Sequence, residues 1–191
     1  EGIAKSVKIL CDALGVWCII AISENNPEKG IKYRHAWNIV KVNSKYYHID
    51  ATFDNSLSKT GGIRYDYFAL SDRQIFRDHE PVIWKVPECA DEDSFYYKTK
   101  KLSFTKMEDV RKRSAQAVKK GRVLNFHWRG GHITKEVVQE MLDIFEEEAI
   151  KKSRHARVAL NWPQAVVRVS FEDKLDHEDV EYQEANEGEK E

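Results

Sequence analysis

Two neighbouring stretches decide the fold of the N-terminal half of this chain: Arg34-His35-Ala36-Trp37-Asn38-Ile39-Val40 and Tyr46-Tyr47-His48-Ile49-Asp50-Ala51-Thr52-Phe53-Asp54. In both, apolar and aromatic residues alternate with polar ones, which is typical of half-buried strands. Asn43 and Ser44 lie between them and suit a two-residue turn. The sequence therefore predicts a β-hairpin with strands at 34–42 and 46–53.

The register of this hairpin brings an imidazole and a carboxylate together. With a two-residue loop, Val42 pairs with Lys45 and His35 lies opposite Thr52. Asp50 is then the diagonal neighbour of His35, on the same face of the sheet, at about 7–8 Å. Because an imidazole oriented by a carboxylate is two thirds of a nucleophilic triad, we predict His35 and Asp50 as catalytic residues. The alternative is a structural histidine paired with a carboxylate.

The hairpin resembles the transglutaminase-like superfamily, whose fold is related to papain-like cysteine peptidases. That family has a Cys opening a helix in a Cys-x-Gly context, then a His-Ala-Trp strand, then a strand ending in Asp-x-Thr. His35-Ala36-Trp37 matches the second part and Asp50-Ala51-Thr52 the third. The likeness is to the bacterial branch, continues through 64–72 and Asp78-His79, and covers roughly the first half of the chain.

The first part of the family pattern lacks its nucleophile here. Glu1-Gly2 match the x-Gly, so the resemblance implies a Cys immediately before Glu1 and a core truncated just after it. Cys11 belongs to the apolar stripe of the expected helix 2–14, Cys18 to a buried strand at 16–23, and Cys89 to a linker at 81–93. None sits at a helix N-terminus, where a thiolate is stabilised. We therefore expect the chain as given to have no thiol-dependent activity.

The resemblance implies an acyltransferase or a hydrolase of the cysteine protease superfamily, acting on a protein or peptide. His35 would deprotonate the Cys, which would attack a peptide or glutamine carboxamide carbonyl. Asp50 would fix the tautomer of His35 and stabilise its charged form. Water as acceptor gives hydrolysis and a lysine amine gives cross-linking, and the sequence leaves both open. The compartment is open too, with a bacterial cell-surface or secreted location among the possibilities.

Charge is distributed unevenly along the 191 residues, although the net charge is only −1. Residues 1–94 carry −2, residues 95–172 carry +8 and residues 173–191 carry −7. With the motifs above, this predicts three parts: a transglutaminase-like core at 1–90, a small basic α/β domain at 95–172, and an acidic tail at 173–191 that we expect to be disordered. The fold class expected for the whole is α+β. No apolar run is long enough to span a membrane.

The sequence of the basic domain predicts the element order β-α-β-α-β-β. We expect a strand at 95–104, a helix from a capping box at Thr105 and Glu108 to Gly121, and a strand at 122–128. A helix capped by Thr134 should follow, buried through Val137, Val138, Met141, Leu142, Phe145, Ala149 and Ile150. Strands at 157–160 and 165–171 complete the unit.

Several polar residues have two interpretations. The cations Lys106, Arg111, Lys112, Arg113, Lys119, Lys120 and Arg122 form a solvated helix face or a docking surface for an anionic partner. The second interpretation gives the alternative function, a non-catalytic transglutaminase-like binding module that docks this partner through residues 95–172. No base-stacking motif points to nucleic acid.

His48 fits a surface or packing role, and His127 and His132 fit a strand-to-helix turn better than a metal site without a third ligand. We expect no cofactor and no metal.

Overall fold

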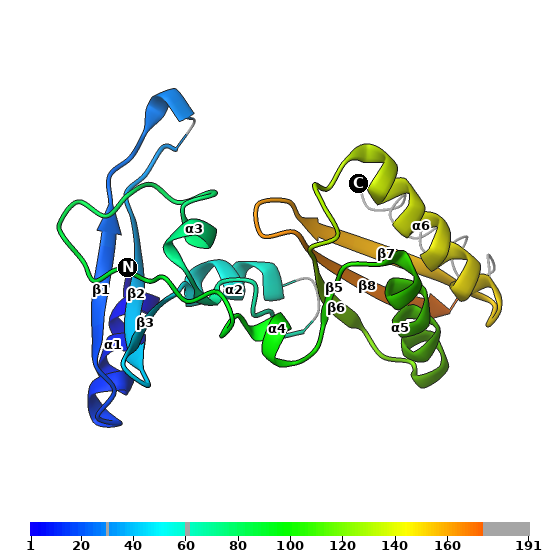
Figure 1. Cartoon of the computed structure of the whole chain (residues 1–191), viewed down its shortest axis with the longest axis horizontal. Helices are drawn as coiled ribbons and strands as arrows, with labels where there is room; N and C mark the ends of the chain where they lie inside the picture. The colour runs from blue at the N-terminus through cyan, green and yellow to red at the C-terminus, as the bar shows by residue number, and fades with distance from the viewer. Residues whose placement is uncertain (30, 60–61, 174–191) are drawn as a thin grey trace, which may run out of the picture. The chain divides into compact units, whose positions relative to one another are not determined.

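The computed structural model describes residues 1–29, 31–59 and 62–173. Within that part it contains six α-helices and two four-stranded sheets, which confirms the predicted α+β class (Figure 1). The chain divides into two compact units. The first comprises residues 1–103 together with 125–129 and 160–167, and the second comprises 104–124, 130–159 and the residues from Arg168 onward. No helix in the described ranges is both long and apolar enough to cross a membrane.

The first sheet contains the predicted hairpin. It has the strand order β1-β2-β3-β4, with β1 at Cys18–Ser23, β2 at His35–Val42, β3 at Lys45–Ile49 and β4 at Phe68–Leu70, and neighbouring strands are antiparallel. Val42 pairs with Lys45 as predicted. Asn43 and Ser44 have φ values of 49° and 63°, the left-handed conformation that a tight hairpin turn of this hand requires. A short 3₁₀ helix, η1 at Pro27–Lys29, lies between β1 and β2.

The expected strand at 46–53 is wrong beyond Ile49. β3 ends there, and α2 (Ala51–Ser58) begins with Asp50 as its N-cap. The Asp50 side chain accepts hydrogen bonds from the backbone N–H groups of Thr52 and Phe53, as an N-cap carboxylate does. The Asp-x-Thr motif is thus a helix start, and Thr52 lies on α2 instead of facing His35 across a strand pair.

The two faces of this sheet are covered differently. Helix α1 (Gly2–Ala13) packs against β1 and β2, on the face that carries Cys18, Val40 and the buried Tyr47. The main core lies on the other face and includes Trp37, Ile39, Tyr67, Leu70, Ile75, Cys89, Phe95 and Tyr97. The apolar stripe expected on α1 is only partly buried, because Leu10 and Leu14 are 62% and 78% exposed and Ala4 is the residue that packs inward.

The segment after β4 differs from its prediction. Helix α3 (Asp72–Ile75) starts with a capping box between Ser71 and Gln74. Cys89, in the predicted linker at 81–93, is fully buried, and its backbone N–H donates to the Asp72 carboxylate at 3.1 Å. The expected strand at 95–104 is instead a short helix, α4 at Tyr96–Thr99, followed by the two-residue β5 at Ser103–Phe104.

The second sheet has the order β5-β6-β8-β7, and the helices lie between its strands in sequence as predicted. Its elements are α5 (Met107–Lys120), β6 (Leu124–Trp128), α6 (Lys135–Ile150), β7 (Arg154–Asn161) and β8 (Val166–Asp173). Gly121 ends α5 at φ 58° and Thr134 caps α6, both as expected. The capping box at Thr105 is wrong, since Lys106 is the N-cap and makes no side-chain cap. Leu142 and Ile150 of the expected α6 stripe are exposed. The predicted disordered tail falls outside the described residues, apart from Asp173.

Candidate active site

The structure brings His35 and Asp50 together. His35 is the first residue of β2 and Asp50 caps α2 directly after β3. The Nε2 atom of His35 lies 2.5 Å from Oδ2 of Asp50. The predicted proximity is therefore confirmed, although a helix cap and not a strand residue supplies the carboxylate. The catalytic role of the pair stays a prediction.

The Asp50 carboxylate is buried and fully hydrogen-bonded. Its Oδ1 accepts from the N–H groups of Thr52 and Phe53 at 2.9 and 3.1 Å, and its Oδ2 faces His35 and His79. Burial alone would raise the pKa of Asp50, but the hydrogen bonds from the two histidines outweigh it and hold this pKa well below its usual range. Asp50 is thus an anion at neutral pH, fixed in orientation by the first turn of α2.

His79 is a site residue that our sequence analysis did not predict. Its Nε2 lies 2.9 Å from Asp50 Oδ2, and its Nδ1 lies 2.8 Å from Asp78 Oδ1. Asp78 also accepts a hydrogen bond from the Tyr67 hydroxyl at 2.5 Å. The Asp78-His79 dipeptide belonged to the family resemblance. Its contact with Asp50 could not be read from local patterns, because it joins residues 29 positions apart.

The position of the Asp50 carboxylate decides which nitrogen of His35 is available for chemistry. A carboxylate only accepts hydrogen bonds, so the Nε2 facing it carries the proton and Nδ1 is left to take another. The His35 ring is flanked by Trp37 at 5.8 Å and Phe53 at 4.8 Å between ring centroids. Its side chain is 23% exposed, so a reacting group can approach it from solvent.

The first turn of α1 lies beside β2 but on the opposite face from His35. The Asn38 side chain donates to the carbonyl of Ala4 at 3.0 Å. Asn38 and His35 are three residues apart on one strand, so their side chains point to opposite faces. The Glu1 carboxylate is also influenced by Arg34: its pKa is lowered mainly by Lys5, with a smaller contribution from Arg34. The start of α1 is therefore near this end of β2.

A second buried histidine–carboxylate pair lies on the same sheet. Trp37 Nε1 donates to His48 Nδ1 at 2.9 Å, and His48 Nε2 lies 2.7 Å from Asp72 Oδ1. His48 is fully buried, so of its two expected roles it has the packing role. Because its Nδ1 accepts from Trp37, its Nε2 carries a proton for Asp72 and has no free lone pair for a metal ion, although Cys89 lies close enough to complete a three-ligand group.

The strand-to-helix turn expected around His127 and His132 is present between β6 and α6. His127 is buried and its Nδ1 lies 2.9 Å from the Ser103 hydroxyl. Burial and nearby cations lower the pKa of His127 to about 4, so the ring is neutral. His132 is exposed, and the two do not share a potential metal-binding group within the described residues.

An open, mostly apolar cavity of about 410 Å³ lies in the first unit, next to Phe53 and Tyr67. It is lined by Phe53, Ser56, Leu57, Tyr67, Leu160, Asn161, Trp162 and Pro163. Phe53 and Tyr67 also contact the His79 ring, with centroids 4.6 and 5.5 Å away. Two side chains that line the cavity thus also contact the ring of His79. The cavity volume is within the range of small-ligand pockets.

In comparisons with known proteins, neither a family model nor a curated protein matches this sequence. The assignment of function therefore depends on the geometry above and on the sequence resemblance.

The thiols of Cys18 and Cys89 are expected to be unreactive in the folded chain. Burial raises the pKa of Cys18 to about 11 and that of Cys89 to about 12, so almost no thiolate exists at pH 7.5. Iodoacetamide should label both at the rate of global unfolding, and fast in denaturant, as peptide mass mapping would show. Rapid labelling of either thiol in the native state would contradict this burial.

Asp54 is expected to make stability fall as the pH rises. This buried carboxyl accepts from the Tyr67 N–H at 3.0 Å, and burial raises its pKa from 3.8 to about 8. The contribution of Asp54 to the free energy of unfolding is complete below pH 4, where this carboxyl is also protonated in the unfolded chain. It is lost as the pH rises through 8, by up to about 1.4 kcal/mol per pH unit. Asp54→Asn keeps the acceptor and should flatten this slope in urea titrations at pH 5 and pH 8. An equal slope in both proteins would contradict the raised pKa.

Proposed function

We propose that this chain carries the base and the orienting residue of a transglutaminase-like Cys-His-Asp site, with the thiol on the residue that precedes Glu1. The observation that carries the proposal is the 2.5 Å contact between Nε2 of a partly exposed His35 and a fully buried Asp50. A histidine that only fills space needs no exposure to solvent, whereas the His35 side chain is partly exposed. The fold assignment to the transglutaminase-like, papain-related class is part of the same proposal.

The reaction follows from the tautomer of His35. Nδ1 takes the thiol proton, and the thiolate attacks the carbonyl carbon of a peptide or glutamine carboxamide. The resulting imidazolium is stabilised by Asp50 and returns its proton to the departing ammonia or amine, leaving a thioester. Water then gives the acid, and a lysine amine gives a cross-linked amide. In both cases His35 removes the proton of the acceptor.

The surroundings of His35 suit an acyl substrate. The rings of Trp37 and Phe53 lie next to the His35 ring, and such apolar surroundings strengthen its interaction with Asp50. The apolar cavity that begins at Phe53 could hold an apolar side chain next to the reacting carboxamide. We therefore expect peptides with an aromatic or branched residue near the glutamine to be better substrates than polyglutamine.

The proposal is tested by supplying the thiol. This chain, extended by a few residues ending in Cys, is incubated with a glutamine peptide and an amine donor, and ammonia release is measured. The matched control carries Ser in place of that Cys. We expect release from the Cys form alone, and none from the 191-residue chain. A folded Cys form without activity on peptide, amide or amine substrates would contradict the proposal.

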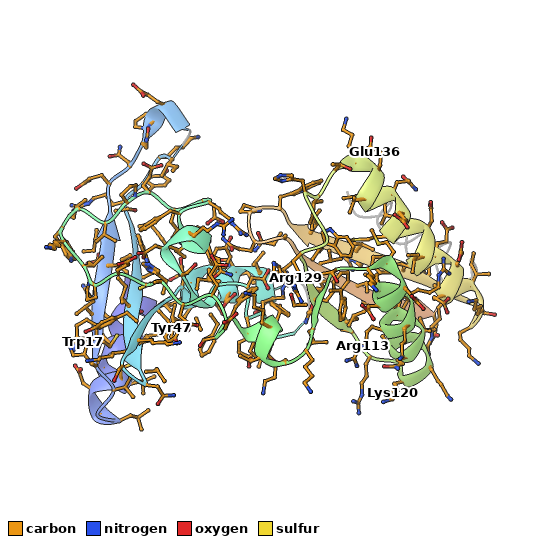
Figure 2. All side chains as sticks on the ribbon, viewed as in Figure 1. Trp17, Tyr47, Arg113, Lys120, Arg129 and Glu136 are labelled. Atoms are coloured by element: carbon orange, nitrogen blue, oxygen red, sulfur yellow. The ribbon has the colours of Figure 1, made fainter. Side chains whose placement is uncertain are left out.

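A second candidate is the non-catalytic binding module, favoured by the basic surface of α5. Lys112, Lys119 and Lys120 are exposed on this helix and Arg122 follows it, whereas Arg111 is bound by Glu147. Figure 2 shows Lys120 at the end of α5. A module of this kind would bind an anionic polymer with an affinity that falls steeply with salt. Replacing Lys112, Lys119 and Lys120 by Ser should then abolish retention on a polyanionic resin. Unchanged retention would leave α5 as an ordinary solvated face.

A further inference from the structure

The His79 ring lies between two carboxylates. Its Nδ1 is 2.8 Å from Asp78 Oδ1 and its Nε2 is 2.9 Å from Asp50 Oδ2. Carboxylate oxygens accept hydrogen bonds and do not donate them when ionised, and a neutral imidazole has one N–H. A neutral His79 would therefore leave one lone pair against an anion in a buried position. The doubly protonated ring satisfies both contacts.

We propose that His79 is a positioning residue of the site, held as an imidazolium between Asp78 and Asp50, and that it fixes the Asp50 carboxylate for His35. The role of Asp50 toward His35 rests on the proposed function. The charge of His79 does not rest on it, because that charge follows from the two carboxylate contacts alone.

The titratable and aromatic groups that the described part of the chain places against His79 are compatible with this cation. Asp50 reaches it from the N-cap of α2, and Asp78 precedes it in the turn after α3. Tyr67 donates to Asp78 and thereby leaves Asp78 as an acceptor toward the ring. The rings of Trp37, Phe53 and His35 lie 5.1, 4.6 and 5.3 Å away. Burial lowers the pKa of His79, but the hydrogen bonds to Asp50 and Asp78 outweigh it and raise this pKa above its ordinary value.

A proton fits this cluster better than a metal ion. His35, Asp50 and His79 could together offer three ligand atoms. However, the two nitrogens lie 2.5 and 2.9 Å from the same Asp50 oxygen, which are hydrogen-bond distances. Ligand atoms of one tetrahedral zinc ion are about 3.3 Å apart, because each lies about 2.0–2.1 Å from the ion.

The imidazolium has a specific consequence for His35. Asp50 Oδ2 is shared between the two rings, so His79 holds this oxygen in place whether His35 is neutral or charged. The positive charge also keeps Asp50 ionised, which a mere packing residue would not do. His79 therefore acts on the reaction through Asp50 and needs no contact with substrate.

The first test measures the His79 ring in the 191-residue chain by ¹⁵N NMR with labelled histidine. We expect the second ring proton to be lost with a midpoint above the ordinary imidazole value of about 6.5. Loss of one ring proton with a midpoint at or below the ordinary value of about 6.5 would overturn the proposal. Equimolar Zn²⁺ should leave the ring signals unchanged, and their replacement by metal-bound signals would also overturn it.

The second test isolates the charge. His79→Gln keeps an amide donor toward Asp50 but removes the cation, and the Asp50 carboxyl carbon is followed by ¹³C NMR. The titration midpoint of the Asp50 carboxyl should move upward by about 1–3 pH units, as expected when an adjacent cation is lost. His48→Gln is the matched control, because it removes an equally buried ring that does not touch Asp50, and should leave the midpoint in place.

An unmoved Asp50 midpoint in folded His79→Gln would show that His79 is structural only. If that variant does not fold, Asp78→Asn serves in its place, and its His79 ring should lose a proton at lower pH than in the unaltered chain. Neither test needs catalysis, so an inactive Cys-bearing form would contradict the proposed function while leaving the charge of His79 unaffected.

Discussion

Replacing Asp66 by Ala should destabilise the first unit by about 3–5 kcal/mol, the typical loss when one partner of a buried ion pair is removed. Asp66 is fully buried and accepts two hydrogen bonds from Arg64, at 2.9 and 2.5 Å. It also accepts from the Tyr97 hydroxyl at 2.9 Å and from Asn161 at 3.0 Å. The substitution leaves the buried Arg64 guanidinium and two further hydrogen-bond donors without their acceptor.

Urea unfolding followed by circular dichroism measures this loss. Asp93→Ala is the control, because Asp93 forms an exposed ion pair with Lys98 at 3.4 Å and should change stability little. Equal stability losses in the two variants would show that the Asp66 cluster is not a major contributor.

His35→Ala should lower the rate of ammonia release by the Cys-bearing form by roughly 10²–10⁴-fold, the usual contribution of a general base. The reason is that the other histidine at Asp50, His79, has both nitrogens against carboxylates and cannot take the thiol proton. The loss should appear in kcat, since the substitution does not reach the apolar cavity.

The control for this variant is His48→Gln, which alters a buried histidine bonded to Trp37 and Asp72 and not to Asp50. It should keep most of the activity. Comparable losses in the two variants would indicate that disturbance of the sheet, and not loss of the base, explains the effect of His35→Ala.

The sequence predicted those parts of the site that depend on local patterns. Alternation and the Asn43-Ser44 turn gave the hairpin and the Val42–Lys45 register, and these bring His35 toward Asp50. The helix start at Asp50 was missed because an Asp-x-Thr following an apolar run fits both a strand end and an N-cap, and only the capping hydrogen bonds distinguish them.

Other features depend on contacts between distant residues. His79 meets Asp50 only because α3 folds back over the sheet, and Cys89 is buried because its backbone bonds to Asp72. Likewise, Phe95 and Tyr97 alternate like strand residues, but they reach the core from the start of the short helix α4. No single-sequence pattern specifies such pairings, because tertiary packing overrides local propensity.

The central claim, that His35 and Asp50 serve a thiol, is tested most directly by the alkylation rate of that thiol as a function of pH. A Cys is placed before Glu1, iodoacetamide is added in excess, and the rate is compared with that of the same protein carrying His35→Ala. We predict that the alkylation rate follows a thiol pKa below the ordinary value of about 8.5. In the variant this pKa should return to the ordinary value. An identical pH profile in the two proteins would contradict the claim.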